Sequence, residues 1–306
     1  MFYILDGSGF LFRAYYSLPK ILDKNWNESW AIFGFFRMLL KLLQEKPDNF
    51  IIVFDPGTKT KRQEEFKEYK QNRPEIDEWF KQQIPKIIKI LKDSNFDVEI
   101  IPEYEADDVI ASLVDTIKKQ GKAVVVSSDK DLKQLIDDNV EFLEPKKMEY
   151  VDKKKFLEEY GFKPENMLLY LALLWDTSDN IPGIKWVWPK TAKKIVEEVE
   201  KKGKIWDENR NLIWDIFLEA IKALPEKLQN LIIENKDLLL RNIDLIKLKN
   251  PGNFDFQKMK NKSNIKNIDF EKLKKILVQD YGFKSFDNLI SKAKKEISQP
   301  TQLGLF

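Results

Sequence analysis

Acidic residues recur at the ends of apolar runs in this chain. Asp6 closes the run FYIL, Asp55 follows FIIVF, and Asp129 and Asp131 follow AVVVSS. Each run has the length and composition of a buried strand, and parallel strands present the residues after their carboxyl ends at one edge of a sheet. We therefore expect these carboxylates to lie close together.

Five further acids extend this candidate cluster. Glu105 and Asp108 stand three residues apart at the start of a predicted helix and share a face, with Asp107 beside them, and Asp176 and Asp179 repeat the spacing after the helical run LLYLALLW. Any one of them could be a helix cap or a favourable charge in a first turn. Nine carboxylates at one edge would repel one another and raise their pKa values unless cations lie between them. The set therefore predicts a metal site.

The chain contains no histidine and no cysteine. Disulfides, zinc sites of the usual kind and Ser-His or Cys-His nucleophiles are therefore excluded. Oxygen ligands alone favour hard cations such as Mg²⁺ or Mn²⁺. Two such ions about 4 Å apart would clamp a scissile phosphate, one activating the attacking water and the other stabilising the leaving oxygen.

Charge is segregated along the 306 residues although the net charge is only +2, with basic residues gathered in 59–73, 185–204 and 245–275. A negative metal pocket beside positive surface suits a phosphodiester substrate. No run of 18 apolar residues occurs, and the start MFYILDG does not have the pattern of a signal peptide. We expect a cytoplasmic, nucleoid-associated monomer.

Alternating strands and helices must position the acids. The sequence predicts strands at Phe2–Leu5, Phe50–Phe54, Val98–Ile101, Ala123–Ser127 and Val140–Leu143, and helices at 29–45, 77–93, 106–119 and 130–137. This rhythm indicates an α/β fold with a mostly parallel central sheet flanked by helices. From residue 152 the pattern turns helical, at Phe156–Tyr160, Glu165–Trp175, Lys190–Lys202 and 211–235. We expect an α/β core at 1–151, a helical DNA-binding domain at 152–297 and a flexible tail at 298–306.

Six motifs, in order and spacing, resemble the 5′ nuclease (flap endonuclease) family, and most closely its bacterial branch, the 5′–3′ exonuclease part of bacterial DNA polymerase I. The similarity runs from about residue 1 to about residue 245. The motifs are LDGSGFLFRAY (5–15), VFDPG (53–57), EYKQNRP (68–74), EADDVI (105–110), SSDKDL (127–132) and DTSDNIPG (176–183).

The resemblance implies a PIN-like 5′ nuclease fold with a helical arch at 58–74 and a helix–hairpin–helix at about 176–200. It implies that all nine acids bind two or more Mg²⁺ or Mn²⁺ ions, that Asp6 and Asp131 are essential to catalysis, and that Lys70 and Arg73 act on the scissile phosphate. The hairpin of the family suggests a K⁺ ion. The DNA contacts implied by the resemblance are Arg13, Lys59, Lys61, Arg62, Tyr69, Lys185, Lys190 and Thr191.

Five tryptophans stand at positions where the family has glycine: Trp26, Trp30, Trp175, Trp186 and Trp188. Glycine suits a hairpin because it accepts positive φ and lets backbone N–H groups approach a phosphate. One interpretation is natural aromatic substitution, with the indoles stacking on DNA. The other is a single cause, UGA codons translated as tryptophan in a source that reads them as glycine. With tryptophan in place, we expect weakened duplex binding.

The last residues resemble the bacterial sliding-clamp-binding peptide, in which a glutamine precedes a hydrophobic plug. The residues concerned are Gln302, Leu303, Leu305 and Phe306. A flexible tail that places two apolar anchors in a pocket would bind in this way.

The function implied is a metal-dependent 5′–3′ exonuclease and 5′ flap endonuclease that acts on DNA with a flap, nick or RNA primer. Two alternatives stay open, a non-catalytic structure-specific DNA-binding protein recruited to the clamp and a PIN-like ribonuclease. A magnesium phosphatase with an aspartyl nucleophile is disfavoured because Asp6-Gly7-Ser8 lacks the second aspartate of that chemistry.

Overall fold

A six-stranded sheet lies at the centre of the fold, in a computed structural model that describes residues 1–17, 19–73 and 75–298. The strand order is β3-β2-β1-β4-β5-β6, and only β6 runs antiparallel to its neighbour. The expected mostly parallel sheet flanked by helices is confirmed. The strands are β1 (Phe2–Asp6), β2 (Asn49–Val53), β3 (Asp97–Glu99), β4 (Ala123–Val126), β5 (Val140–Glu144) and β6 (Glu149–Val151).

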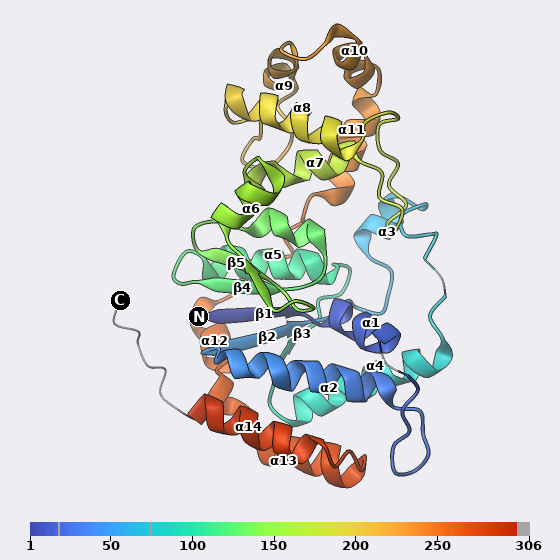
Figure 1. Cartoon of the computed structure of the whole chain (residues 1–306), viewed down its shortest axis with the longest axis vertical. Coiled ribbons are helices and arrows are strands. Elements are labelled where there is room, and N and C mark those ends of the chain that lie inside the picture. The colour runs from blue at the N-terminus through green and yellow to red at the C-terminus, as the bar shows by residue number, and fades with distance from the viewer. Residues whose placement is uncertain (18, 74, 299–306) are drawn as a thin grey trace.

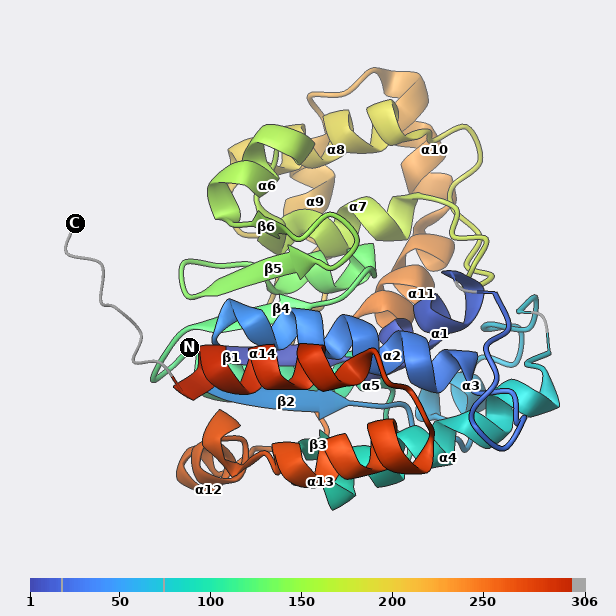
Figure 2. The same cartoon turned by 60° about the horizontal axis from the view of Figure 1, so that its bottom comes forward.

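Helices cover both faces because alternate residues of each strand point to opposite sides. Tyr3 and Leu5 face one cluster of buried side chains, whereas Phe2 and Ile4 face the other. Figures 1 and 2 show helices on both faces of the sheet, with a further group of helices stacked beyond the second face. No helix in these described ranges has the length and apolar character needed to cross a bilayer.

The helices of the first face are α1 (Gly7–Ser17), α2 (Trp30–Leu42), α4 (Glu78–Asp93), α13 (Phe270–Lys274) and α14 (Phe286–Ser298). Beyond the second face lie α5 (Ala106–Ile117), α6 (Lys153–Tyr160), α7 (Met167–Leu173), α8 (Pro189–Lys202), α9 (Trp214–Ile221), α10 (Glu226–Glu234) and α11 (Lys236–Ile246). The short helices α3 (Lys61–Glu65) and α12 (Phe256–Lys262) connect these layers. The remaining turns are η1 (Leu43–Glu45), η2 (Lys130–Leu135), η3 (Pro164–Asn166), η4 (Ile265–Asn267) and the π-helical η5 (Lys275–Asp280).

The structure differs from the local predictions in four places. The segment predicted as a helix at 130–137 is the 3₁₀ helix η2, and the pattern at 211–235 is broken where Pro225 caps α10. Helix α1 was not predicted, because its two glycines give it a low helix propensity. The strand β6 is short and was not predicted either.

The C-terminal helices return to the sheet instead of extending the helical domain. Phe270, Leu277, Phe286 and Ile290 belong to the same buried cluster as Leu5, on the face covered by α2. The expected domain at 152–297 is therefore wrong at its C-terminal end, because the apolar faces of α13 and α14 are buried against α2 and α4.

Candidate active site

The carboxyl ends of β1 and β4 bring Asp6 and Asp129 together through a shared hydroxyl. Ser127 Oγ donates a 2.7 Å hydrogen bond to Asp6 Oδ2 and accepts a 2.9 Å bond from the Asp129 N–H. The Gly9 N–H donates to the other oxygen of Asp6 at 2.8 Å. A Cβ at Gly9 would lie 2.3 Å from Asp6 Oδ2, so the start of α1 needs glycine there to approach the carboxylate.

Asp55 joins the same edge from the end of β2. Its N–H donates to Ser8 Oγ at 2.9 Å, and its Oδ1 accepts from the Ala106 N–H at the start of α5 at 2.8 Å. Ser8 and Ser127 were not predicted as site residues, although each stands near an acid in its motif. The Ser127 hydroxyl orients the carboxylate of Asp6, and the Ser8 hydroxyl holds the backbone that carries Asp55.

Arg62 is a buried cation rather than a DNA contact, which corrects that expectation. Its side chain is 3% exposed and forms a bidentate pair with Asp108, at 2.8 and 2.6 Å. Nη1 also donates to Glu105 Oε2 at 3.0 Å, and Nε and Nη2 donate to the backbone carbonyls of Leu245 and Lys247 at 2.8 and 3.0 Å. The guanidinium therefore occupies both oxygens of Asp108, which argues against the expected role of Asp108 as a direct metal ligand.

The base of the predicted arch is bonded to two of the acids. Lys70 Nζ donates to Glu105 Oε2 at 2.9 Å, and Arg73 Nη2 donates to Asp179 Oδ1 at 2.5 Å. The Tyr69 hydroxyl bridges Glu105 and Asp179 at 3.1 Å to each. Tyr69 is 6% exposed, so the expected contact of this ring with DNA is wrong, and its burial fixes the backbone that carries Lys70 and Arg73.

The loop between α7 and α8 supplies Asp176 and Asp179. Asp176 Oδ1 accepts from the Ser178 N–H and hydroxyl at 2.9 and 2.7 Å and from the Asp179 N–H at 3.1 Å. Lys130 Nζ lies 3.1 Å from Asp176 Oδ2. Burial opposes ionisation, but the Ser178 hydroxyl and Lys130 hold the pKa of Asp176 below its ordinary value.

Three carboxylates that form no ion pair within the described residues have raised pKa values, in contrast to Asp176. Burial, followed by the charges of Asp55 and Asp129, raises the pKa of Asp6 to about 6. Burial and then the charge of Asp129 raise the pKa values of Asp107 and Asp131 well above the ordinary range. These carboxylates therefore need a positive charge that the neighbouring side chains do not supply.

A divalent cation fits this need. Among residues 1–17, 19–73 and 75–298 no three carboxylates are grouped closely enough to hold an ion as they stand. Lysine, arginine and backbone donors take several of the oxygens. Asp131 Oδ1 is nevertheless buried and has no hydrogen-bond partner in this part of the chain. An all-oxygen set with raised pKa values and an unpartnered oxygen matches the donor preference of Mg²⁺ or Mn²⁺.

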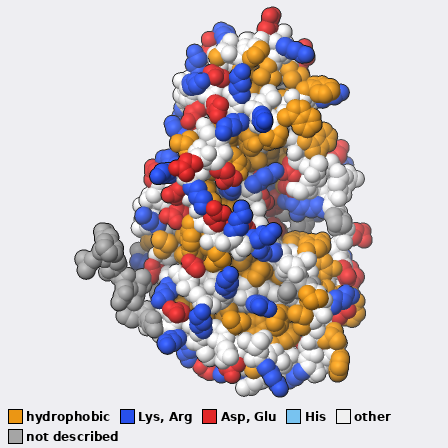
Figure 3. Space-filling view, viewed as in Figure 1, with side chains coloured by type: hydrophobic (Ala, Val, Ile, Leu, Met, Phe, Trp, Pro, Cys, Tyr) orange, Lys and Arg blue, Asp and Glu red, His pale blue; other side chains and the backbone are white. Residues whose placement is uncertain are grey.

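The surface between the helical part and the sheet part is hollowed and carries charges of both signs (Figure 3). Lys59, Lys185 and Lys190 are exposed, and Thr191 is half-buried in the first turn of α8. Two other predicted DNA contacts are paired within the protein: Lys61 Nζ donates to the Tyr104 hydroxyl at 2.9 Å, and Arg13 lies 3.7 Å from Glu144.

The five tryptophans at glycine-like positions fall into different environments. Trp26 and Trp186 adopt φ of 64° and 70°, the left-handed region that glycine favours, and their side chains are 81% and 67% exposed. Trp175 and Trp188 are also exposed and, with Trp186, wall a cavity of about 870 Å³. Trp30 is 3% exposed and its ring lies 5.5 Å from that of Tyr15. The backbone therefore favours glycine at 26 and 186 but accommodates tryptophan at 30.

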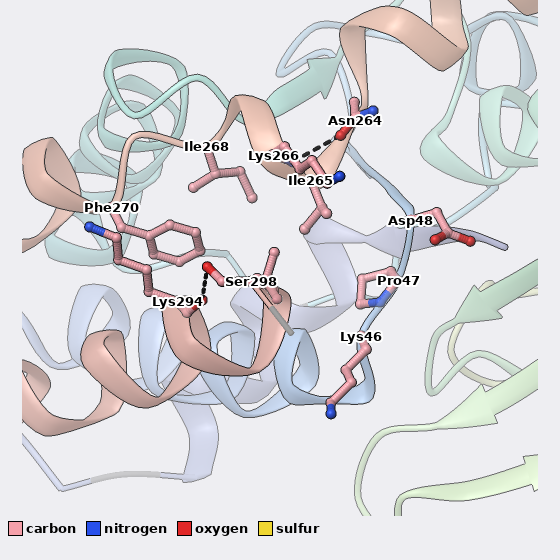
Figure 4. A pocket seen from close by; sticks show the side chains of 11 residues that line it. Lys46, Pro47, Asp48, Asn264, Ile265, Lys266, Ile268, Phe270, Lys294 and Ser298 are labelled. Atoms are coloured by element: carbon pink, nitrogen blue, oxygen red, sulfur yellow. Dashed lines mark hydrogen bonds between the residues drawn. The ribbon is translucent and has the colours of Figure 1, made fainter. Parts of the chain in front are cut away.

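A second cavity, of about 540 Å³, lies at the opposite end of the sheet. It opens beside residues 46–48, which precede β2, and is lined by η4, α13 and α14 (Figure 4). Lys46, Lys266 and Lys294 surround an apolar floor that includes Phe270. Asp55 follows the other end of β2, so this cavity is separate from the acids.

Comparison with known proteins agrees with this geometry. Residues 1–161 match the family described as 5′-3′ exonuclease, N-terminal resolvase-like domain. A 5′-3′ exonuclease of Aquifex aeolicus is 37% identical over 282 residues, which cover 87% of this chain and 94% of the relative. DNA polymerase I of Bacillus subtilis is 33% identical over 248 residues, covering 79% of this chain and 27% of that protein. The flap endonuclease of bacteriophage T5, solved with DNA and metal ions, shares the fold at a TM-score of 0.64 and 19% identity, with 97% and 99% of the two chains covered.

Proposed function

The chain belongs to the 5′–3′ exonuclease family and is a nuclease, and from this premise we propose that it uses Mg²⁺ to cut DNA at a 5′ flap, a nick or an RNA primer. The observation that carries the proposal is a set of buried carboxylates with raised pKa values at the sheet edge, one of them with an unpartnered oxygen among the described residues, beside the basic base of the arch. An acidic cation site beside donors for a phosphate is the arrangement that phosphodiester hydrolysis requires.

The acids divide by their surroundings. Asp6, Asp55, Asp107, Asp129 and Asp131 lie at the carboxyl ends of the strands and the start of α5, where their mutual repulsion favours bound cations. When bound, divalent ions supply a nucleophilic water at neutral pH and polarise the phosphate. Asp176 and Asp179 provide a second group of ligands. Glu105 is linked to this group because the Tyr69 hydroxyl bonds both Glu105 and Asp179, and Glu105 also accepts a bond from Lys70. Asp108 contributes to the site indirectly, because it holds Arg62, which in turn bonds and positions Glu105.

Lys70 and Arg73 act on the scissile phosphate. Their N–H donors already face the cluster, on Glu105 and Asp179, and a phosphate oxygen accepts the same donors. Donation to the phosphate stabilises the charge that develops on its oxygens during cleavage. Because the Lys70 side chain is largely buried, its position is defined before substrate arrives.

The exposed lysines hold the rest of the substrate. Lys59 lies on the arch segment, and Lys185 and Lys190 flank the hairpin that precedes α8. Contacts of this kind bind the sugar–phosphate backbone without reading sequence, so recognition depends on the shape of the branch. We include a K⁺ ion at the hairpin in the proposal only for a protein with glycine at positions 186 and 188, because glycine would let backbone carbonyl groups approach the ion.

Cleavage of defined substrates tests the function. The wild-type protein is expected to cut a 5′-flap DNA in Mg²⁺ and to lose this activity with EDTA, whereas Asp131→Asn keeps the fold by circular dichroism and loses cleavage by orders of magnitude. An Asp131→Asn protein with full activity would remove Asp131 from the mechanism. Wild-type binding of flap DNA without any cleavage would favour the non-catalytic DNA-binding protein, and preferred cleavage of single-stranded RNA would favour the PIN-like ribonuclease.

Binding to a sliding clamp through Gln302, Leu303, Leu305 and Phe306 is part of the proposal, and these residues lie outside the described ranges. Deletion of 302–306 is expected to abolish clamp binding in a pull-down assay and to leave flap cleavage unchanged. Clamp affinity that survives the deletion would refute this role of the tail.

A further inference from the structure

Two asparagines join the base of the arch to the loop that carries Asp176 and Asp179. Asn72 Nδ2 donates a 2.8 Å hydrogen bond to Asn180 Oδ1, and Asn180 Nδ2 donates a 2.7 Å bond to the Glu68 carbonyl. Between these bonds the Lys70 N–H donates to the Asp179 carbonyl at 3.0 Å. These three hydrogen bonds, two of them made by the Asn180 side chain, form a clasp between segments 68–73 and 178–180. They add to the bonds that Tyr69 and Arg73 donate to Ser178 and Asp179.

We propose that Asn72 and Asn180 are positioning residues, which set the distance and orientation of Lys70 and Arg73 relative to the acids. The inference rests on the proposed function of the site. Among the described residues neither asparagine side chain hydrogen-bonds a carboxylate, so both act through the backbone that carries Lys70, Arg73 and Asp179.

The backbone at both ends of the clasp adopts a conformation that needs support. Lys70 has φ of 59° and Asn180 has φ of 56°, in the left-handed region that residues other than glycine seldom adopt. Asparagine tolerates this region better than most residues, but lysine does not share that preference. Strained backbone of this kind persists where surrounding contacts hold it and often marks a functional site. The clasp supplies those contacts for Lys70.

The chemistry of the clasp requires an amide. An amide donates and accepts, so Asn180 can receive a bond from Asn72 and give one to Glu68. A carboxylate at 180 could not donate to the carbonyl, and it would add a negative charge beside Asp176 and Asp179. The bond between the two side chains is solvent-exposed, and such bonds contribute little to global stability. Its effect is therefore on geometry rather than on folding.

Single-turnover cleavage of a 5′-flap DNA tests the clasp in four variants: Asn72→Ala, Asn180→Gly, the double variant, and Asn95→Gly as a control. Glycine at 180 keeps the left-handed backbone and removes only the side chain. Asn95 is a matched control because it has φ of 59°, is exposed and lies in the loop between α4 and β3.

Both single variants are expected to slow cleavage by about 10- to 100-fold, since small displacements of positioned groups cost rates of this order. The double variant is expected to be no slower than Asn180→Gly, because that substitution already breaks the bond that Asn72→Ala removes. The Mg²⁺ concentration for half-maximal rate, the Kd for flap DNA in EDTA and the Tm should stay at wild-type values, as should the rate of Asn95→Gly.

Two results would overturn the positioning role while leaving the nuclease intact: rates of Asn72→Ala and Asn180→Gly within twofold of wild type, or a double variant whose defect is the product of the two. A loss of Tm equal in all three variants would assign the clasp to folding instead. A wild-type protein that does not cleave flap DNA in Mg²⁺ would refute the proposed function itself.

Discussion

Replacement of Arg62 by methionine tests whether a buried guanidinium holds the site together. Arg62 joins the arch, the start of α5 and the end of α11 through five hydrogen bonds, and its side chain and that of Asp108 are 3% and 2% exposed. Methionine fills a similar volume but leaves the carboxylate of Asp108 without a counter-charge. Glu105 keeps Lys70 as a partner, so the loss falls mainly on Asp108.

The expected loss is large because the pair is buried. Removal of one partner from a buried ion pair costs about 3–5 kcal/mol, a substantial part of the roughly 5–15 kcal/mol that stabilises a folded domain. Arg73→Met is the matched control, since the side chain of Arg73 is 48% exposed and its pair with Asp179 is screened by solvent. An exposed pair contributes about 0–1 kcal/mol.

Urea unfolding followed by circular dichroism measures both variants. Addition of Asp108→Asn to Arg62→Met is expected to recover part of the loss, because the second change removes the uncompensated charge. A loss below about 1 kcal/mol for Arg62→Met, the size of a surface pair, would refute the structural role. A double variant less stable than Arg62→Met would show that the charge of Asp108 is not the cause.

Three further predictions follow from other sites. Burial raises the folded-state pKa of Asp97 to about 6 from an ordinary value of 3.8. Because the folded protein then holds this proton more tightly than the unfolded chain, the free energy of unfolding falls as pH rises through this interval. Asp97→Asn should flatten that dependence in urea unfolding between pH 4 and 7, and parallel profiles would contradict it. Trp186→Gly removes the unfavourable left-handed conformation of a tryptophan, so it should leave Tm unchanged or raise it and should strengthen duplex binding. The control Trp206→Gly removes a buried ring and should lower Tm. A UGG codon at position 186 would rule out the misread-glycine explanation. Lys190→Ala should weaken flap binding equally for all sequences and lower the slope of log K against log salt by about 0.9 if one phosphate contact is lost, and an unchanged slope would place Lys190 outside the interface.

The acids and the sheet that carries them are predictable from the sequence, because the signals are local. Alternating strand and helix patterns predict a mostly parallel sheet, and the acids that follow each strand then share one edge whatever the details of packing. The absence of histidine and cysteine restricts the chemistry to oxygen ligands in the same way. The left-handed φ of Trp26 and Trp186 is the backbone conformation that glycine favours, which agrees with the expectation of glycine at these positions from the resemblance.

Only the tertiary structure decides which charged groups meet. Arg62 and Lys59 belong to the same basic segment, yet one is buried against Asp108 and the other is exposed. The return of α13 and α14 to the sheet and the contact between Asn72 and Asn180 likewise join segments far apart in the chain. Such pairings depend on loop paths and on which apolar face finds a free partner, and neither leaves a periodic signal in the local sequence.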